Sequence, residues 1–129
     1  RTLRRRRLVL ALVAAMAAPA AIAQSLPTGG TVVNGGATIT PGGSTLTINQ
    51  TTRGAIINWG TFNIGSGYGV TFNQPGSNGV TLNRVLGTLG SSIDGSLSAN
   101  GSVFIVNTNG ITFGSGAQVN VGGLVASTL

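Results

Sequence analysis

The chain has 129 residues and a formal net charge of +6, with seven basic side chains, one acidic side chain, and no histidine or cysteine. A chain without cysteine cannot form disulfides. With neither cysteine nor histidine, it also lacks the ligands of the usual zinc sites. Five of the seven arginines lie in the first seven residues, so the basicity does not indicate a nucleic-acid-binding surface. Beyond residue 23, the only charged side chains are Arg53, Arg84 and Asp94.

Residues 1–23 have the composition of a secretory signal peptide. Arginines precede an apolar run from Leu8 to Ala18, Pro19 ends that run, and the triplet Ala21-Ile22-Ala23 is a typical cleavage site. The run is shorter than the roughly 20 residues that a membrane-spanning helix needs. We therefore expect residues 1–23 to be a cleaved signal peptide that makes the only membrane contact. The mature domain is then expected over residues 24–129, after Sec-dependent export to the periplasm.

Residues 31–129 have the pattern of many short strands. Runs of β-branched and aromatic residues are closed by Gly, Asn or Ser, and no segment has a helical period. Asn-Gly pairs favour tight turns, because both residues tolerate a left-handed backbone. The pattern predicts strands at Thr31–Val33, Ala37–Thr40, Thr45–Asn49, Ala55–Trp59, Phe62–Ile64, Val70–Asn73, Val80–Asn83, Ser92–Leu97, Val103–Asn107, Ile111–Phe113, Gln118–Val121 and Leu124–Ser127.

Short strands in this number are compatible with an all-β sandwich, a barrel or a β-solenoid. The scarcity of charge and the compact Gly/Asn corners favour the solenoid, in which rungs stack about 4.8 Å apart. An end rung exposes unpaired backbone groups, so we expect residues 24–36 to form a cap. The final run, residues 124–129, carries no stop signal, and we expect the domain to be truncated there and further rungs to follow.

Ordered, closely spaced motifs cover most of residues 31–129. They are Gly54–Gly65, Val70–Pro75, Leu82–Val85, Ile93–Gly101, Val103–Ile111 and Gly116–Thr128. In this order they resemble the N-terminal two-partner secretion (TPS) domain of filamentous-haemagglutinin-like exoproteins. The resemblance implies a right-handed parallel β-helix with a small N-terminal cap.

The same resemblance implies a function in secretion. The domain would be recognised by a dedicated outer-membrane transporter whose periplasmic POTRA domains bind the unfolded or partly folded segment. The exoprotein would then fold outside, so the resemblance places it at the surface of a Gram-negative outer membrane or in the medium. Members of this family are large adhesins, haemagglutinins, haemolysins or toxins, and any host receptor or glycan would be bound by downstream regions.

One turn motif departs from the family pattern. Asn107, Thr108, Asn109 and Gly110 stand where the family usually carries Asn-Pro-Asn-Gly. The motif has two interpretations: a transporter-recognition signal, or a structural corner between two faces of the coil. Thr lacks the fixed φ of Pro, so we expect a corner of the same kind with less rigidity. The second family turn, Asn-Pro-Asn-Leu, is absent, and residues 82–85 stand in that region.

Asn58, Trp59, Phe62, Asn83 and Arg84 belong to the other family motifs and are predicted as core or motif residues. Trp59 is the only tryptophan, and its large apolar area favours a core anchor over an exposed contact for the transporter. Arg84 and Asp94 have opposite charges and could meet across adjacent strands.

The mature segment offers little for catalysis, because general acid–base chemistry needs histidine, paired carboxylates or a tuned lysine. We therefore predict no catalytic, cofactor-binding or metal-binding residues. The main alternative to the secretion role is a surface adhesin module that binds carbohydrate or host receptors directly through polar Asn, Thr and Ser ladders. An enzymatic role would need catalytic residues beyond Leu129.

Overall fold

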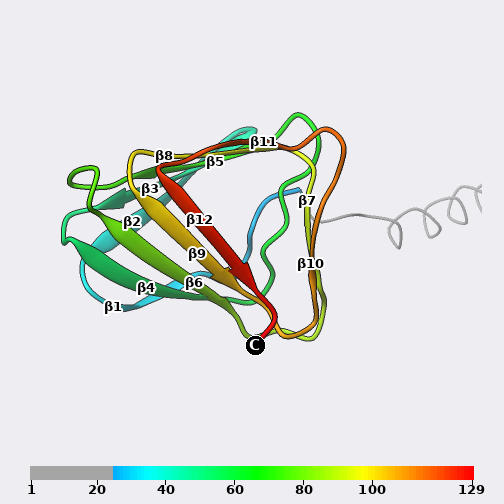
Figure 1. Ribbon diagram of the computed structural model, residues 1–129, viewed down its shortest axis with the longest axis horizontal. Helices are drawn as coiled ribbons and strands as arrows, with labels where there is room; N and C mark the ends of the chain where they lie inside the picture. The colour runs from blue at the N-terminus through cyan, green and yellow to red at the C-terminus, as the bar shows by residue number, and fades with distance from the viewer. Residues whose placement is uncertain (1–24) are drawn as a thin grey trace, which may run out of the picture.

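The computed structural model describes residues 25–129, and every regular element in that range is a β-strand (Figure 1). The predicted signal peptide lies outside the described residues. No helix in the described part is long and apolar enough to span a bilayer. The strands are β1 (Thr31–Asn34), β2 (Ala37–Gly42), β3 (Thr45–Gln50), β4 (Gly54–Trp59), β5 (Gly69–Asn73), β6 (Val80–Val85), β7 (Ser91–Ile93), β8 (Ser96–Ala99), β9 (Ser102–Val106), β10 (Ile111–Phe113), β11 (Gln118–Asn120) and β12 (Gly123–Ser127).

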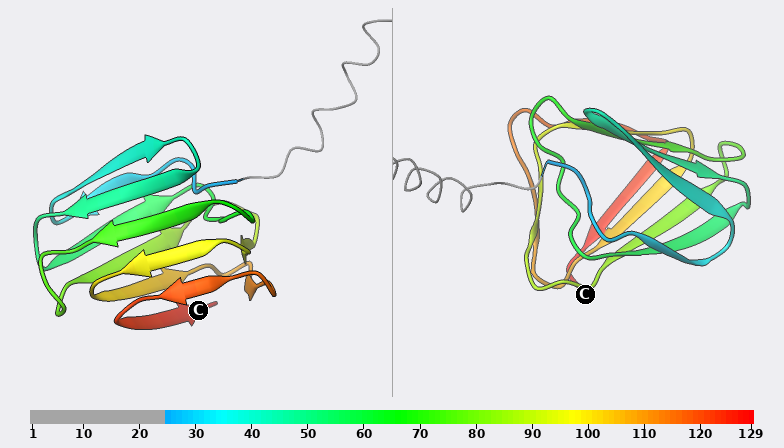
Figure 2. Two further views of the ribbon diagram at one scale, coloured as in Figure 1. Left: turned by 90° about the horizontal axis from the view of Figure 1, so that it is seen from above. Right: turned by 180° about the vertical axis from the view of Figure 1, so that it is seen from behind.

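The strands wind into a parallel β-helix with three sides (Figure 1). Sheet I contains β1, β4, β6, β9 and β12, sheet II contains β2, β3, β5, β8 and β11, and sheet III contains β7 and β10. Successive rungs are β3–β4, β5–β7, β8–β10 and β11–β12, and they lie one above another in the side view (Figure 2). The predicted solenoid is therefore confirmed, and the sandwich and the barrel are wrong.

Equivalent residues of successive rungs pair in register. One column of sheet I contains Gly54, Val80, Ser102 and Gly123. The parallel ladders satisfy the backbone donors and acceptors of each rung through the rungs on either side of it. The coil therefore repeats a structural unit although the sequence shows no exact repeat.

Two antiparallel strands, β1 and β2, cover the first rung. β1 pairs antiparallel with β4, and β2 pairs antiparallel with β3. Val32 and Ile39 from these two strands pack against the core. This arrangement blocks the open edge of the first rung, which would otherwise be free to pair with another chain. The N-terminal cap is confirmed, but it extends beyond the predicted residues 24–36, because β2 runs to Gly42.

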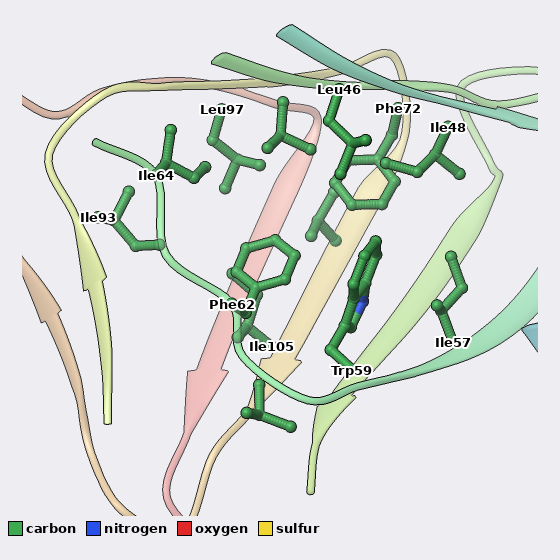
Figure 3. Packing of buried hydrophobic residues seen from close by; sticks show 13 residues of the cluster. Leu46, Ile48, Ile57, Trp59, Phe62, Ile64, Phe72, Ile93, Leu97 and Ile105 are labelled. Carbon is green, nitrogen blue, oxygen red and sulfur yellow. The ribbon is translucent and has the colours of Figure 1, made fainter. Parts of the chain in front are cut away.

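The core runs along the axis of the coil, where alternate residues of each strand point inward (Figure 3). The largest fully buried side chains come from the first two rungs and include Trp59, Phe62 and Phe72. Trp59 and Phe62 make an edge-to-face contact, with ring centroids 5.5 Å apart. Apolar burial of this kind supplies most of the stability of a domain that has no disulfides.

Two predicted strands differ in the structure. Phe62 and Ile64 are fully buried, but only Ile64 forms a bridge, with Ile93, so residues 62–64 are not a strand. The predicted strand Ser92–Leu97 is divided into β7 and β8 at Asp94 and Gly95, because the chain turns from sheet III to sheet II there.

Gly95 is required at this turn. A Cβ atom at Gly95 would lie 2.3 Å from the carbonyl oxygen of Tyr68 and 2.4 Å from that of Gly65, both of which are backbone atoms. We expect Gly95→Ala to lower the free energy of unfolding by about 2 kcal/mol, measured by urea denaturation and circular dichroism. The control is Gly54→Ala, because a Cβ at Gly54 meets nothing within 4 Å. Equal effects of the two substitutions would contradict the packing argument.

Candidate functional site

The turn motif Asn107–Gly110 lies at the corner between β9 of sheet I and β10 of sheet III. The Gly110 N–H donates to the Asn107 carbonyl over 3.0 Å, which closes a β-turn. Gly110 has a φ of 107°, in the region that favours glycine. Among the described residues only glycines have a positive φ. The exposed Thr108 therefore adopts an ordinary backbone conformation and adds no strain to the turn.

The Asn107 side chain is fully buried and connects the turn to the rung before it. Its amide nitrogen donates to the Leu89 carbonyl (3.0 Å) and to the Ser91 hydroxyl (2.9 Å). Its Oδ1 accepts from the Asn109 N–H at 2.9 Å. Asn107 therefore holds both its own turn and the stacking of two rungs at this corner.

Two exposed leucines lie beside the turn. The loop that follows β6 presents Leu86 and Leu89, which are 66% and 61% exposed. Asn109 donates its side-chain amide to the carbonyl of Gly87 in the same loop (3.1 Å). We call Leu86, Leu89, Thr108 and Asn109 the corner surface. It combines exposed apolar area with polar groups, a combination that is typical of protein-binding surfaces.

The family-motif residues Trp59 and Asn83 meet inside the coil. The indole Nε1 of Trp59 donates to the Asn83 Oδ1 at 2.8 Å, and the Asn83 amide donates to the carbonyl of Phe104 at 3.2 Å. Trp59 is 2% exposed and Asn83 is fully buried. These contacts join β4, β6 and β9, which belong to three successive rungs. Trp59 is therefore part of the core rather than of an exposed surface.

Arg84 and Asn58 meet on the outer face of sheet I, where the Arg84 Nε donates to the Asn58 Oδ1 at 2.9 Å. The expected contact of Arg84 with Asp94 across adjacent strands is wrong. The neighbours of β6 are β4 and β9, whereas Asp94 follows β7 in sheet III. The Asp94 carboxylate accepts instead from the Ser92 hydroxyl at 2.9 Å.

A buried polar ladder at the corner between sheets II and I was not predicted. Gln50 and Gln74 occupy equivalent positions after Asn49 and Asn73, which pair in β3 and β5. Both glutamines are buried, and the hydroxyl of fully buried Thr81 donates to the Gln50 Oε1 and accepts from the Gln74 Nε2. The repeated dipeptide Asn-Gln at residues 49–50 and 73–74 is the sequence signal that identifies this ladder.

The two glutamines also bind the backbone of the corner. The Gln50 Nε2 donates to the carbonyls of Arg53 and Val80, at 3.1 and 3.0 Å. The Gln74 Nε2 donates to the Ser102 carbonyl at 2.8 Å, and its Oε1 accepts from the Gly101 N–H. Since buried polar groups are costly unless paired, these contacts favour one register between rungs.

The described geometry shows a stack of rungs joined by buried polar contacts, and the family comparison agrees with this fold. The model of the TPS secretion domain family matches residues 23–129. The chain belongs to the TPS secretion domain family. This TPS domain is also similar to a solved structure, the HMW1 secretion domain from Haemophilus influenzae, with a TM-score of 0.77 and 42% identity. The match covers 80% of this chain and 27% of that one.

Two curated relatives of this TPS domain are heme/hemopexin-binding proteins of Haemophilus influenzae. One, from strain ATCC 51907 / DSM 11121 / KW20 / Rd, is 44% identical over 108 residues, which is 84% of this chain and 12% of the relative. The other is 45% identical over 83 residues, 64% of this chain and 9% of the relative. The chain thus spans about an eighth or less of the curated relatives it matches.

The predicted residues of the TPS domain fall into two separate groups. Asn107–Gly110 lie at the corner of sheets I and III, next to Leu86 and Leu89. Trp59, Phe62 and Asn83 lie in the core, and Asn58 with Arg84 lies on the outer face of sheet I. Only the first group presents exposed side chains at a turn, so it is the candidate for recognition.

Proposed function

We propose that this TPS domain is the secretion signal and folding nucleus of a large exported exoprotein, recognised by a cognate outer-membrane transporter with periplasmic POTRA domains. The family match over residues 23–129 is the observation that carries this proposal. TPS domains belong to secreted or cell-surface proteins. In the proposed route, a signal peptide directs the chain to the periplasm before the transporter moves it across the outer membrane.

The cap on the first rung supports a role in nucleating folding, because later rungs can then stack in one direction only. The first rung is covered by β1 and β2, whereas the inward side chains of the last described rung, such as Val121 and Leu124, are only partly buried. A further rung can add to β11 and β12 by backbone pairing and bury these side chains. Addition of rungs outside the cell would favour outward movement of the chain.

The corner surface is the proposed contact for the transporter. Leu86 and Leu89 offer apolar area that no described residue covers fully, and Asn109 and Thr108 offer polar groups beside it. The hydrogen bonds of Asn107 to Leu89 and of Asn109 to Gly87 form only once two rungs have stacked, and they bring the loop with the two leucines next to the turn. Recognition by this surface would therefore require a partly folded domain rather than an extended chain.

The test is export from cells that express the full-length exoprotein with its transporter. We expect the double variant Leu86→Ser, Leu89→Ser to reduce the protein in the medium at least about fivefold, because the loss of two apolar anchors weakens docking. The control is Val80→Ser, at the opposite end of β6, where the valine is 37% exposed. Export of the double variant at the wild-type rate would contradict the proposed contact, and export without any transporter would contradict the proposed function.

The activity of the whole protein depends on regions outside this domain. The curated relatives are heme/hemopexin-binding proteins by name, and the chain covers only a small part of each. We propose that downstream regions act as an adhesin or ligand-binding module, and that the TPS domain itself has no catalytic role.

A further inference from the structure

The outer faces of the two large sheets differ in chemistry. On sheet I, the column Ile56, Leu82, Phe104 and Val125 points outward. On sheet II, two outward columns are polar: Thr45, Gly69, Ser96 and Gln118 form one, and Thr47, Thr71, Ser98 and Asn120 form the other. Sheet II therefore presents a regular array of hydroxyl and amide groups along the axis of the coil.

A groove of about 460 Å³ lies where this polar face meets the corner with sheet III. Each rung contributes to its lining: Thr45 from the first, Tyr68 from the second, Ser96 from the third and Gln118 from the fourth. Gly69 lies between Thr45 and Ser96 in the same column, and its missing side chain leaves the centre of the array open. A volume of this size is within the range of small-molecule sites.

The groove also contains Asp94, the only acidic residue of the chain. One carboxylate oxygen accepts from the Ser92 hydroxyl. The other lies close to Gly114, where a Cβ atom would be 1.8 Å from it, so a larger residue at position 114 would displace the carboxylate. Asp94 is half-buried, and the hydrogen bond from Ser92 orients its carboxylate on the wall of the groove.

Tyr68 supplies an aromatic surface to the same groove. The residue is half-buried and packs against the hydrophobic core, and its N–H donates to the Gly65 carbonyl at 2.9 Å. Tyr68 lines the groove together with Asp94 and Ser96. An aromatic ring presents apolar area together with a polar hydroxyl tip.

We propose that this groove binds a neutral saccharide. The apolar C–H face of a sugar ring stacks on Tyr68, neighbouring sugar hydroxyls donate to Asp94, and others exchange hydrogen bonds with Ser96, Thr71 and Gln118. No cationic side chain lines the groove, so a sulfated or sialylated sugar would bring its negative charge to Asp94 without compensation. This binding function goes beyond export and does not depend on the corner surface.

The test uses the purified full chain and an array of galactosyl, mannosyl and N-acetylglucosaminyl oligosaccharides, with sialylated and sulfated forms as anionic counterparts. Binding of the best oligosaccharide is then measured by titration calorimetry. A single sugar unit in an open groove should bind with a Kd of about 1 mM. We expect Asp94→Asn and Gly69→Val each to weaken binding at least tenfold.

Gly69→Val adds a branched side chain to the groove at a position where a Cβ atom would lie no closer than 3.5 Å to other atoms. Its matched control is Gly54→Val, which adds the same side chain at the first position of β4 on sheet I and should leave binding unchanged. Circular dichroism confirms folding of each variant. The proposal is overturned if no neutral oligosaccharide binds, if Gly69→Val and Asp94→Asn bind normally, or if anionic forms bind equally well.

Discussion

Asn107→Ala should destabilise the domain by about 3 kcal/mol. The substitution leaves the buried Ser91 hydroxyl without its side-chain partner, and it also removes the contacts of the Asn107 side chain with the Leu89 carbonyl and the Asn109 N–H. Each unsatisfied buried group costs about 1–3 kcal/mol, although local rearrangement recovers part of that cost. Urea denaturation followed by circular dichroism measures the change, which would be a large fraction of the stability of a small domain.

The matched control for this substitution is Asn120→Ala, which removes the same side chain from an exposed position in β11. We expect it to change the free energy of unfolding by less than about 0.5 kcal/mol. A loss of stability below about 1 kcal/mol for Asn107→Ala would contradict the role of Asn107 in joining two rungs.

Export of the same variant separates the two interpretations of the turn motif. If Asn107 acts only through stability, export should fall equally in another variant with the same loss of stability, such as Gly95→Ala combined with a second core substitution. If the motif is itself recognised, Asn107→Ala should be exported less than that stability-matched variant. The comparison is needed because Asn107 lies buried while Thr108 and Asn109 lie exposed beside it.

The strands were predictable because their signals are local. β-Branched residues alternate with turn residues throughout residues 31–129, and β10 (Ile111–Phe113) was predicted with its observed bounds. The predicted strands were wrong where contacts with the neighbouring rung determine the local structure. Residues 62–64 have the apolar pattern of a strand, but only Ile64 has a pairing partner. The break at Gly95 depends on two carbonyl groups from the preceding rung.

The buried polar contacts were harder to predict than the core. Trp59 was expected inside because of its large apolar area, and the structure places it there. Gln50 and Gln74 follow strands and have the composition of turn residues, so their burial depends on a register that no local pattern contains. The same reason explains why the turn at Asn107 was expected but its contacts with Leu89 and Ser91 were not.

Trp59→Phe should lower the free energy of unfolding by about 3 kcal/mol. The smaller ring leaves a cavity beside Phe62 and removes the donor to the Asn83 Oδ1, which remains buried. Since Trp59 is the only tryptophan, the variant loses intrinsic tryptophan fluorescence, and circular dichroism must follow its unfolding. Asn83→Leu, which leaves the indole N–H without its acceptor, should cost a similar amount.

The double variant Trp59→Phe, Asn83→Leu tests whether these two costs have a common origin. Once both partners are replaced, no side-chain donor or acceptor of this pair remains unpaired, and the leucine fills part of the space that the asparagine left. We therefore expect the double variant to be more stable than the sum of the single effects predicts, by about 1–2 kcal/mol. Additive effects would mean that Trp59 stabilises the coil through its packed area alone, and that the hydrogen bond does not help to hold β4 and β6 in register.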